Sequence, residues 1–101
     1  MESVPPLHID PPPELVHFLD SGGRLKKWPA RKRRSLQIAA LQWIATFFEA
    51  GRTYREREVN EIIKSHIAFE DYVLVRRELF ELGLLGRTSD GRSYWRTSPV
   101  E

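Results

Sequence analysis

The sequence contains no cysteine, and it also lacks the motifs by which many active sites are recognised. Without thiols, the chain has no disulfide framework, no thiolate metal site and no cysteine nucleophile. Its three histidines, His8, His17 and His66, are too scattered to resemble a set of metal ligands. A glycine-rich phosphate loop and a Ser-His-Asp arrangement are absent as well. We therefore expect a protein that is not an enzyme and that needs no metal or cofactor.

Long apolar runs are also missing. The longest apolar stretch, residues 36–48, is interrupted by Gln37, Gln42 and Thr46, which makes it too polar to span a membrane. The first thirteen residues have neither the basic start nor the apolar block of a signal peptide. These features predict a cytoplasmic protein without membrane contact.

Proline is concentrated at the beginning of the chain and is scarce elsewhere. Five of the seven prolines fall within residues 1–13, which predicts an extended, flexible arm because proline-rich segments do not pack regularly. The rest of the 101 residues is enough for one small domain, which we expect at residues 14–98.

Acidic residues are absent from one strongly cationic stretch, residues 24–34, which we call the basic segment. Its seven cations are Arg24, Lys26, Lys27, Arg31, Lys32, Arg33 and Arg34. The formal net charge is only +2, because the other nine cations are outnumbered by fourteen acids and leave a balance of −5. A local excess of positive charge attracts polyanions without reading their sequence.

Three helices are predicted after a short amphipathic helical turn at residues 14–20. We expect Pro29 to open the first helix, because proline is favoured at the first helical position, and Gly51 to stop it. Thr53 and Glu56 have the spacing of a capping box, which predicts that the second helix starts after Thr53. The broad apolar surface of the first helix would also permit a homodimer.

The third helix, predicted over residues 70–82 and ended by Gly83, carries apolar residues on two faces. Its predicted core face contains Tyr72, Val75, Leu79 and Leu82. The outward side has Arg77 together with three apolar residues, Val73, Leu74 and Phe80. Apolar residues on an outward face require a cover, which is either the following hairpin or a partner.

The chain ends in a predicted β-hairpin. Asp90-Gly91 is a strong turn signal that pairs Arg87 with Tyr94 and Gly86 with Trp95. In this register, strand alternation buries Trp95 and leaves four side chains on the open face: Arg87, Arg92, Tyr94 and Arg96. A slip of one residue would reverse the two faces.

This order of elements predicts an α+β, mainly α, winged-helix-like domain. It would comprise three helices, a C-terminal two-stranded hairpin and an extra short N-terminal helix. Residues 52–54 lie where a small first strand often pairs with the wing.

Residues 25–96 also resemble a bacterial family of domains of unknown function, some of which are attached to helix-turn-helix transcriptional regulators. The matching motifs are Gly23-Arg24-Leu25, Trp28-Pro29-Ala30, Tyr54-x-Glu56-x-Glu58-Val59-Asn60, Asp71-Tyr72, Arg76-Arg77-Glu78-Leu79, Gly83-Leu84-Leu85, Arg87 and Asp90-Gly91-x-x-Tyr94-Trp95-Arg96. The resemblance implies a winged-helix-like fold and a role in transcription, with no settled ligand or reaction. Because no DNA-reading domain precedes it here, we expect this domain to bind by itself or through a partner.

Two functions from different classes follow. The first is a winged-helix domain that binds double-stranded DNA in transcription through the basic segment, the third helix and the wing. Its expected contacts are Arg31, Lys32, Arg33, Arg34, Arg77, Arg87, Arg92, Tyr94 and Arg96. The alternative is a protein–protein interaction module of the transcription machinery, which would use Val73, Leu74, Phe80 and the basic segment. Glu78 and Glu81 favour the alternative because they repel phosphate, whereas the wing arginines favour DNA.

Each basic group also has a structural interpretation. We expect residues 31–34 on the first turn of a helix, where the macrodipole disfavours cations, so a polyanion or an acid of the same chain would offset their charge. Glu56, Glu58 and Glu61 are candidates for that acid. Arg76 lies on the flank of the third helix and could pair either with Glu78 or with an acid of the second helix. The wing arginines could simply protect an edge strand from aggregation.

Overall fold

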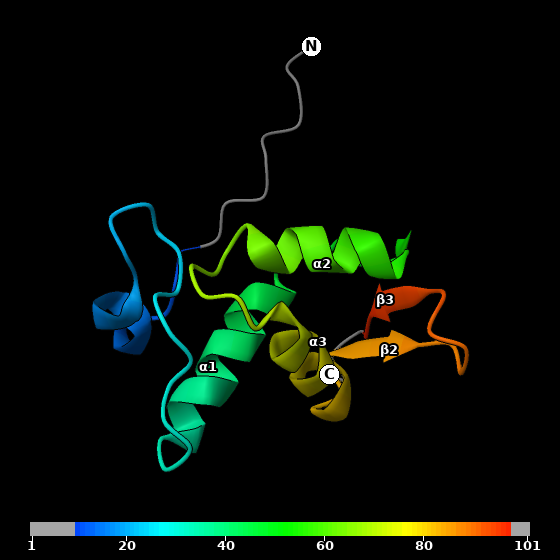
Figure 1. Cartoon of the computed structure of the whole chain (residues 1–101). Helices are drawn as coiled ribbons and strands as arrows, with labels where there is room; N and C mark the ends of the chain where they lie inside the picture. Colours follow the sequence, from blue (N-terminus) through cyan, green and yellow to red (C-terminus); the bar gives the residue numbers. More distant parts are fainter. Residues whose placement is uncertain (1–9, 98–101) are drawn as a thin grey trace.

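The structure is a computed structural model that describes residues 10–97. Most of the predicted arm, residues 1–9, and the predicted domain end at residue 98 lie outside the described residues. The elements are η1 (Pro13–Phe18), α1 (Arg34–Ala45), β1 (Thr53–Tyr54), α2 (Glu56–Lys64), α3 (Tyr72–Glu81), β2 (Leu85–Arg87) and β3 (Tyr94–Arg96) (Figure 1).

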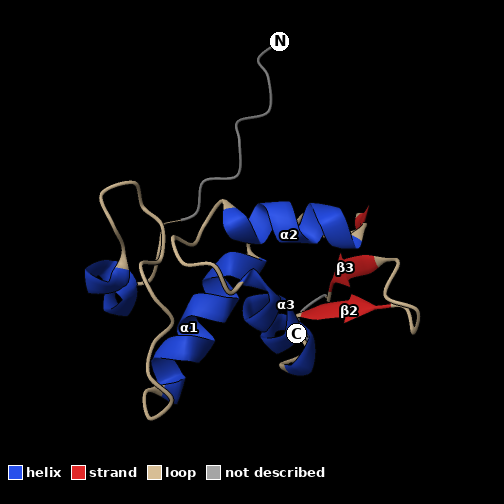
Figure 2. Ribbon diagram, in the orientation of Figure 1, coloured by secondary structure: helices blue, strands red, loops and turns tan. Residues whose placement is uncertain are grey.

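The helices gather on one side of the domain, and the strands form a small antiparallel sheet on the other (Figure 2). The strand order is β1-β3-β2, so the short β1 pairs with the hairpin strand that comes last in the chain. The predicted fold class is confirmed: this is a small, mostly helical α+β domain whose topology is consistent with a winged helix.

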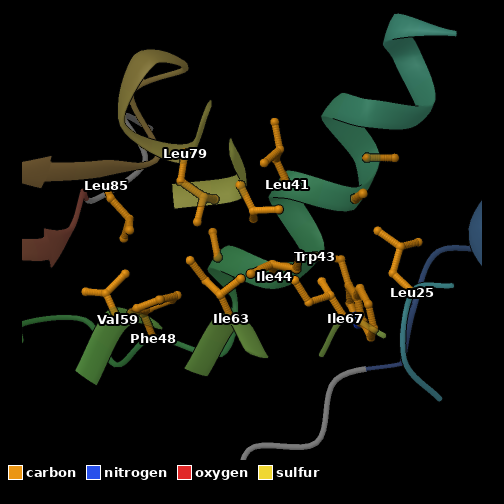
Figure 3. Packing of buried hydrophobic residues seen from close by; sticks show 14 of the residues in the cluster. Leu25, Leu41, Trp43, Ile44, Phe48, Val59, Ile63, Ile67, Leu79 and Leu85 are labelled. Carbon is orange, nitrogen blue, oxygen red and sulfur yellow. The ribbon is translucent and has the colours of Figure 1, made fainter. Parts of the chain in front are cut away.

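The core lies where the three α-helices meet the inner face of the sheet. Figure 3 shows Ile44 of α1, Ile63 of α2 and Leu79 of α3 in this core, and each of these side chains is fully buried. Burying a side chain of this size contributes about 1.5–3 kcal/mol. Leu25, from the basic segment, extends the core beside Trp43 (Figure 3).

The start of α1 differs from the prediction. The helix begins at Arg34 rather than at Pro29, so residues 31–33 precede it instead of forming its first turn. The amide of Gln37 explains the difference, because its Nε2 donates to the backbone oxygens of Pro29 at 2.8 Å and of Ala30 at 3.3 Å. These bonds fasten the preceding turn against the helix and satisfy the one buried polar side chain among the described residues.

The end of α1 also differs, because the helix stops at Ala45 and not near Gly51. After Ala45 the backbone changes to bonds between residues three apart, such as the 3.1 Å bond from the Phe48 N–H to the Ala45 oxygen. This tighter winding accompanies complete burial of Phe48. Gly51, with φ of +82°, serves the loop before β1 instead. The apolar surface of α1 on which a homodimer would depend is largely buried within the domain.

The cap of α2 lies two residues later than predicted. Thr53 is extended because it belongs to β1 and pairs with Trp95 of β3. The first residue outside the helix is therefore Arg55, whose N–H donates to the Glu58 Oε1 at 2.8 Å. The carboxylate of Glu56, assigned to the cap in the sequence, is free to interact with α3.

The end of α3 matches the prediction. Gly83 has φ of +81°, and its N–H donates to the Phe80 oxygen at 3.0 Å. The N–H of Leu84 reaches the Leu79 oxygen at 2.9 Å, which completes a Schellman motif. Val75 and Leu79 are fully buried, as predicted, with Tyr72 and Leu82 packed beside them.

The hairpin strands pair in the predicted register, but the face predicted to be open is the buried one. Arg87 pairs with Tyr94 and Gly86 with Trp95. However, Tyr94 is only 2% exposed, whereas Trp95 lies half-buried on the outer face. The reason is that Leu85 and the β1 residue Tyr54, both buried, share the face of Tyr94 and hold it against the core. The prediction of an exposed Tyr94 is therefore wrong.

The indole of Trp95 packs so close to residue 86 that only a glycine fits there. A Cβ added to Gly86 would lie 2.5 Å from the Trp95 Nε1, far closer than atoms pack. We expect Gly86→Ala to lower the free energy of unfolding by about 1–3 kcal/mol and to shift the NMR signal of the Trp95 indole N–H. Gly22→Ala is the matched control, because its Cβ would meet only the Asp20 Oδ1 at 3.5 Å. Equal stability of the two variants would contradict this packing.

Candidate nucleic-acid interface

The outward face of α3 is partly apolar and uncovered within the described residues. Val73 and Phe80 are 44% and 38% exposed, and Leu74 is half-buried. The helix starts at Asp71, whose Oδ1 accepts the Leu74 N–H at 3.1 Å. The hairpin covers the Phe80 ring only in part, through Arg87, and it leaves Val73 accessible.

Arg77 and Arg87 meet this apolar face from α3 and β2. The Arg87 guanidinium lies over the Phe80 ring, 4.5 Å from its centroid. Arg77, Phe80 and Arg87 line one hollow of about 270 Å³ between α3 and the sheet. We call this surface the α3–wing face. Both arginines are exposed and form no ion pair with any residue from 10 to 97.

Phe80 and Arg87 belong to rival predictions, one for a protein partner and one for DNA. The structure places these two side chains in contact, so the two predicted surfaces overlap here. Glu56 and Glu81 also line the hollow, so two acids lie on this surface. Sequence periodicity gave the outward direction of Phe80 but not its contact with Arg87, because the two lie on different elements.

Arg76 has a structural role beside this surface. Its Nη1 donates to the Asn60 Oδ1 at 2.6 Å and lies 3.5 Å from the Glu56 Oε2. Only 18% of its side chain is exposed. Of the two acidic partners considered for Arg76, the structure shows the acid of the second helix, and this arginine links α2 to α3. No local sequence signal identifies Asn60 as its partner, since the two are sixteen positions apart.

The wing retains one exposed arginine at its tip. Arg92 has a side chain that is 86% exposed, and its Nε lies 3.8 Å from the Asp90 Oδ2. Asp90 also accepts hydrogen bonds from the Thr88 hydroxyl at 2.6 Å and from the Arg92 N–H at 3.0 Å. These bonds lower the pKa of the Asp90 carboxyl, and the bond from Thr88 has the largest effect. Arg96 is half-buried, and its Nη1 donates to the Phe48 oxygen at 3.2 Å. Arg96, like Tyr94, is thus directed toward the core and not toward the open face.

The basic segment is divided by its contacts. Arg34 lies 3.1 Å from the Glu78 Oε1 and donates to the Gln37 Oε1 at 2.7 Å, so it connects α1 to α3. This pair neutralises Glu78, one of the two acids that disfavoured phosphate in the sequence. Arg31 and Lys32 are exposed and have no acidic partner in the described part of the chain.

His66 has the surroundings of a packed side chain. His66 stacks on Phe47 with ring centroids 3.8 Å apart, and its Nδ1 lies 2.8 Å from the Ile62 oxygen. Burial lowers the pKa of His66, which favours its neutral form.

Within residues 10–97, no group of three or more His, Asp or Glu side chains could hold a metal ion. No helix in the described chain has the length and apolar character needed to cross a membrane.

Comparison with known proteins gives a family but no characterised relative. No curated protein and no solved structure matches the chain. Residues 24–96, which run from the basic segment to the end of β3, match a family described as an uncharacterized protein conserved in bacteria (DUF2087). Since that match covers most of the sequence, the chain belongs to this uncharacterized bacterial family.

Proposed function

We propose that this domain binds double-stranded DNA through the α3–wing face and acts in transcription. The observation that carries the proposal is the pairing of Arg77 and Arg87 around one hollow on the outward side of α3. Both guanidinium groups lack an acidic partner among the described residues, and Phe80 holds Arg87 in place. In winged-helix proteins, the third helix and the wing are the elements that meet a duplex.

Further cations flank this face. Arg92 would reach phosphate from the tip of the wing, while Arg31 and Lys32 would contact the backbone from the turn before α1. Arg33, the other cation expected there, instead lies over the Phe18 ring. The pairing of Arg34 with Glu78 supports the proposal, because it neutralises one of the negative charges of α3. A role in transcription is also supported by the resemblance to domains attached to transcriptional regulators. The proposal is for a binding function and not for catalysis.

A salt titration tests the proposal. Labelled random-sequence duplex should bind the full chain at low salt with roughly micromolar affinity, and log K should fall by about 0.9 per decade of salt for each phosphate contact. Repeating the duplex titration from low to high ionic strength therefore gives the number of phosphate contacts. Absence of binding at the lowest salt would overturn the proposal.

One observation favours the second candidate, a protein-interaction module. Val73 and Phe80 are exposed apolar residues, and Glu81 beside them is better suited to a protein than to phosphate. Under this alternative, Phe80→Asp should abolish capture of a partner without unfolding the domain, since Phe80 is 38% exposed. Duplex binding that survives Phe80→Asp while partner capture is lost would favour the alternative for this residue.

A further inference from the structure

A second hollow lies at the other end of the molecule, between η1 and the basic segment. Figure 1 shows η1 and the wing on opposite sides of the helical layer. The hollow has a volume of about 570 Å³ and is lined by His17, Phe18, Lys26, Lys27, Ala30 and Arg33. Its lining contains no acid. We call it the η1 hollow.

The backbone around this hollow is held in place by the core. The N–H of Leu25 donates to the His66 oxygen at 2.9 Å, and the Leu25 oxygen accepts the Ala68 N–H at 2.8 Å. The next N–H, of Lys26, donates to the Phe18 oxygen at 2.8 Å and so joins the basic segment to η1. Lys26 and Lys27 therefore project from a fixed backbone and not from a free loop.

The charges of the hollow are not neutralised within the domain. Lys26, Lys27 and Arg33 form no ion pair with any described residue. Asp20 is the acid whose charge interacts with Lys26, but its Oδ1 accepts the N–H groups of Gly22 and Arg24, both at 2.9 Å. The bond from the Arg24 N–H, more than any other contact, lowers the pKa of Asp20. The lysines and Arg33 remain available for an anion.

An aromatic ring accompanies these cations. Phe18 is half-buried and lines the hollow, and the Arg33 guanidinium lies 5.6 Å from the centroid of its ring. Cations beside a partly exposed aromatic ring are a combination that binds nucleotides, because phosphate pairs with the cations and a base stacks on the ring. The volume lies within the range of small-ligand sites.

We propose that the η1 hollow binds a nucleotide, with its phosphate near Lys26, Lys27 and Arg33 and its base against Phe18. This site is separate from the α3–wing face and does not depend on duplex binding. The ligand is either a free nucleoside phosphate or an unpaired nucleotide of a strand, since both present the same phosphate and base.

Binding by the full chain can be measured with three probes: ATP, inorganic pyrophosphate and a short single-stranded oligo-dA. We expect saturable binding of at least one nucleotide probe, with NMR shifts confined to residues 17–33. Phe18→Leu should weaken nucleotide binding about tenfold and leave pyrophosphate binding unchanged, because only the base needs the ring. The double variant Lys26→Glu with Lys27→Glu should abolish binding of every probe.

Charge-matched controls make the result decisive. The pair Arg57→Glu with Lys64→Glu changes two exposed α2 cations that do not line the hollow, and it should leave binding unchanged. Equal loss in this control, or nucleotide affinity unchanged by Phe18→Leu, would overturn the proposal, as would the absence of saturable nucleotide binding. Preference for ATP identifies a free nucleotide as the ligand, and preference for oligo-dA identifies a strand. Removing Arg77 and Arg87 should not change nucleotide binding at the η1 hollow. A loss of duplex binding can therefore be distinguished from a loss of nucleotide binding.

Discussion

Leu25→Ala should lower the free energy of unfolding by about 2–5 kcal/mol, the largest effect expected from any change in the basic segment. Leu25 is fully buried, although most of this cationic stretch is exposed. Truncating it leaves a cavity beside Trp43 and Ile67, since the fold around it is held by backbone bonds that the substitution does not remove (Figure 3). For a domain of this size, such a loss is a large part of the total stability.

Urea unfolding followed by circular dichroism measures this effect directly. Val16→Ala is a suitable control, because Val16 lies on the neighbouring η1 and is 53% exposed, and its unfolding free energy should change by less than about 0.5 kcal/mol. If Leu25→Ala proved as stable as this control, the basic segment would not be fastened to the core in solution. The fixed geometry of the η1 hollow would then be wrong as well.

The second large effect is expected on duplex binding. Replacing Arg77 and Arg87 together by alanine should weaken duplex affinity about a hundredfold at low salt, because a hydrogen bond to a charged group contributes about 1.5–3 kcal/mol. The salt dependence of log K should become shallower by about 1.8, which is 0.9 for each phosphate contact removed. The fold should persist, since both side chains are exposed.

The control for this double variant removes the same charge from α2, by Arg57→Ala with Lys64→Ala. Neither residue lines the hollow of the α3–wing face, so the slope and the affinity should stay near those of the parent. Equal weakening by both variants would show that net charge alone attracts the duplex. Unchanged binding by the Arg77 and Arg87 variant would remove the α3–wing face from the interface.

The sequence alone determined the features that depend on neighbouring residues. The Asp90-Gly91 turn set the register of β2 and β3, because the positions of the turn residues determine which strand residues pair. Gly83 ended α3 because its positive φ permits the bonds that close the helix. Apolar spacing on α3 also gave both the buried row with Leu79 and the outward position of Phe80.

The tertiary structure decided the features that depend on distant partners. Strand alternation defines two faces of the hairpin but not which of them is buried, and burial of Tyr94 follows from its place beside Leu85 and opposite Tyr54. The same β1 pairing extends Thr53 and thereby moves the cap of α2 to Arg55. Neither outcome can be read from local spacing.

Charge partners were decided in the same way. Arg34 meets Glu78, and Arg76 meets Glu56 and Asn60, across contacts between helices that are separated in sequence. These contacts determine which arginines of the chain are available and which are engaged in the fold. Residue type and spacing therefore established the secondary-structure elements and the number of basic residues. Packing between the elements decided on which surface basic side chains stay unpaired. The physical reason is that an ion pair forms only where the fold brings two side chains within a few ångströms.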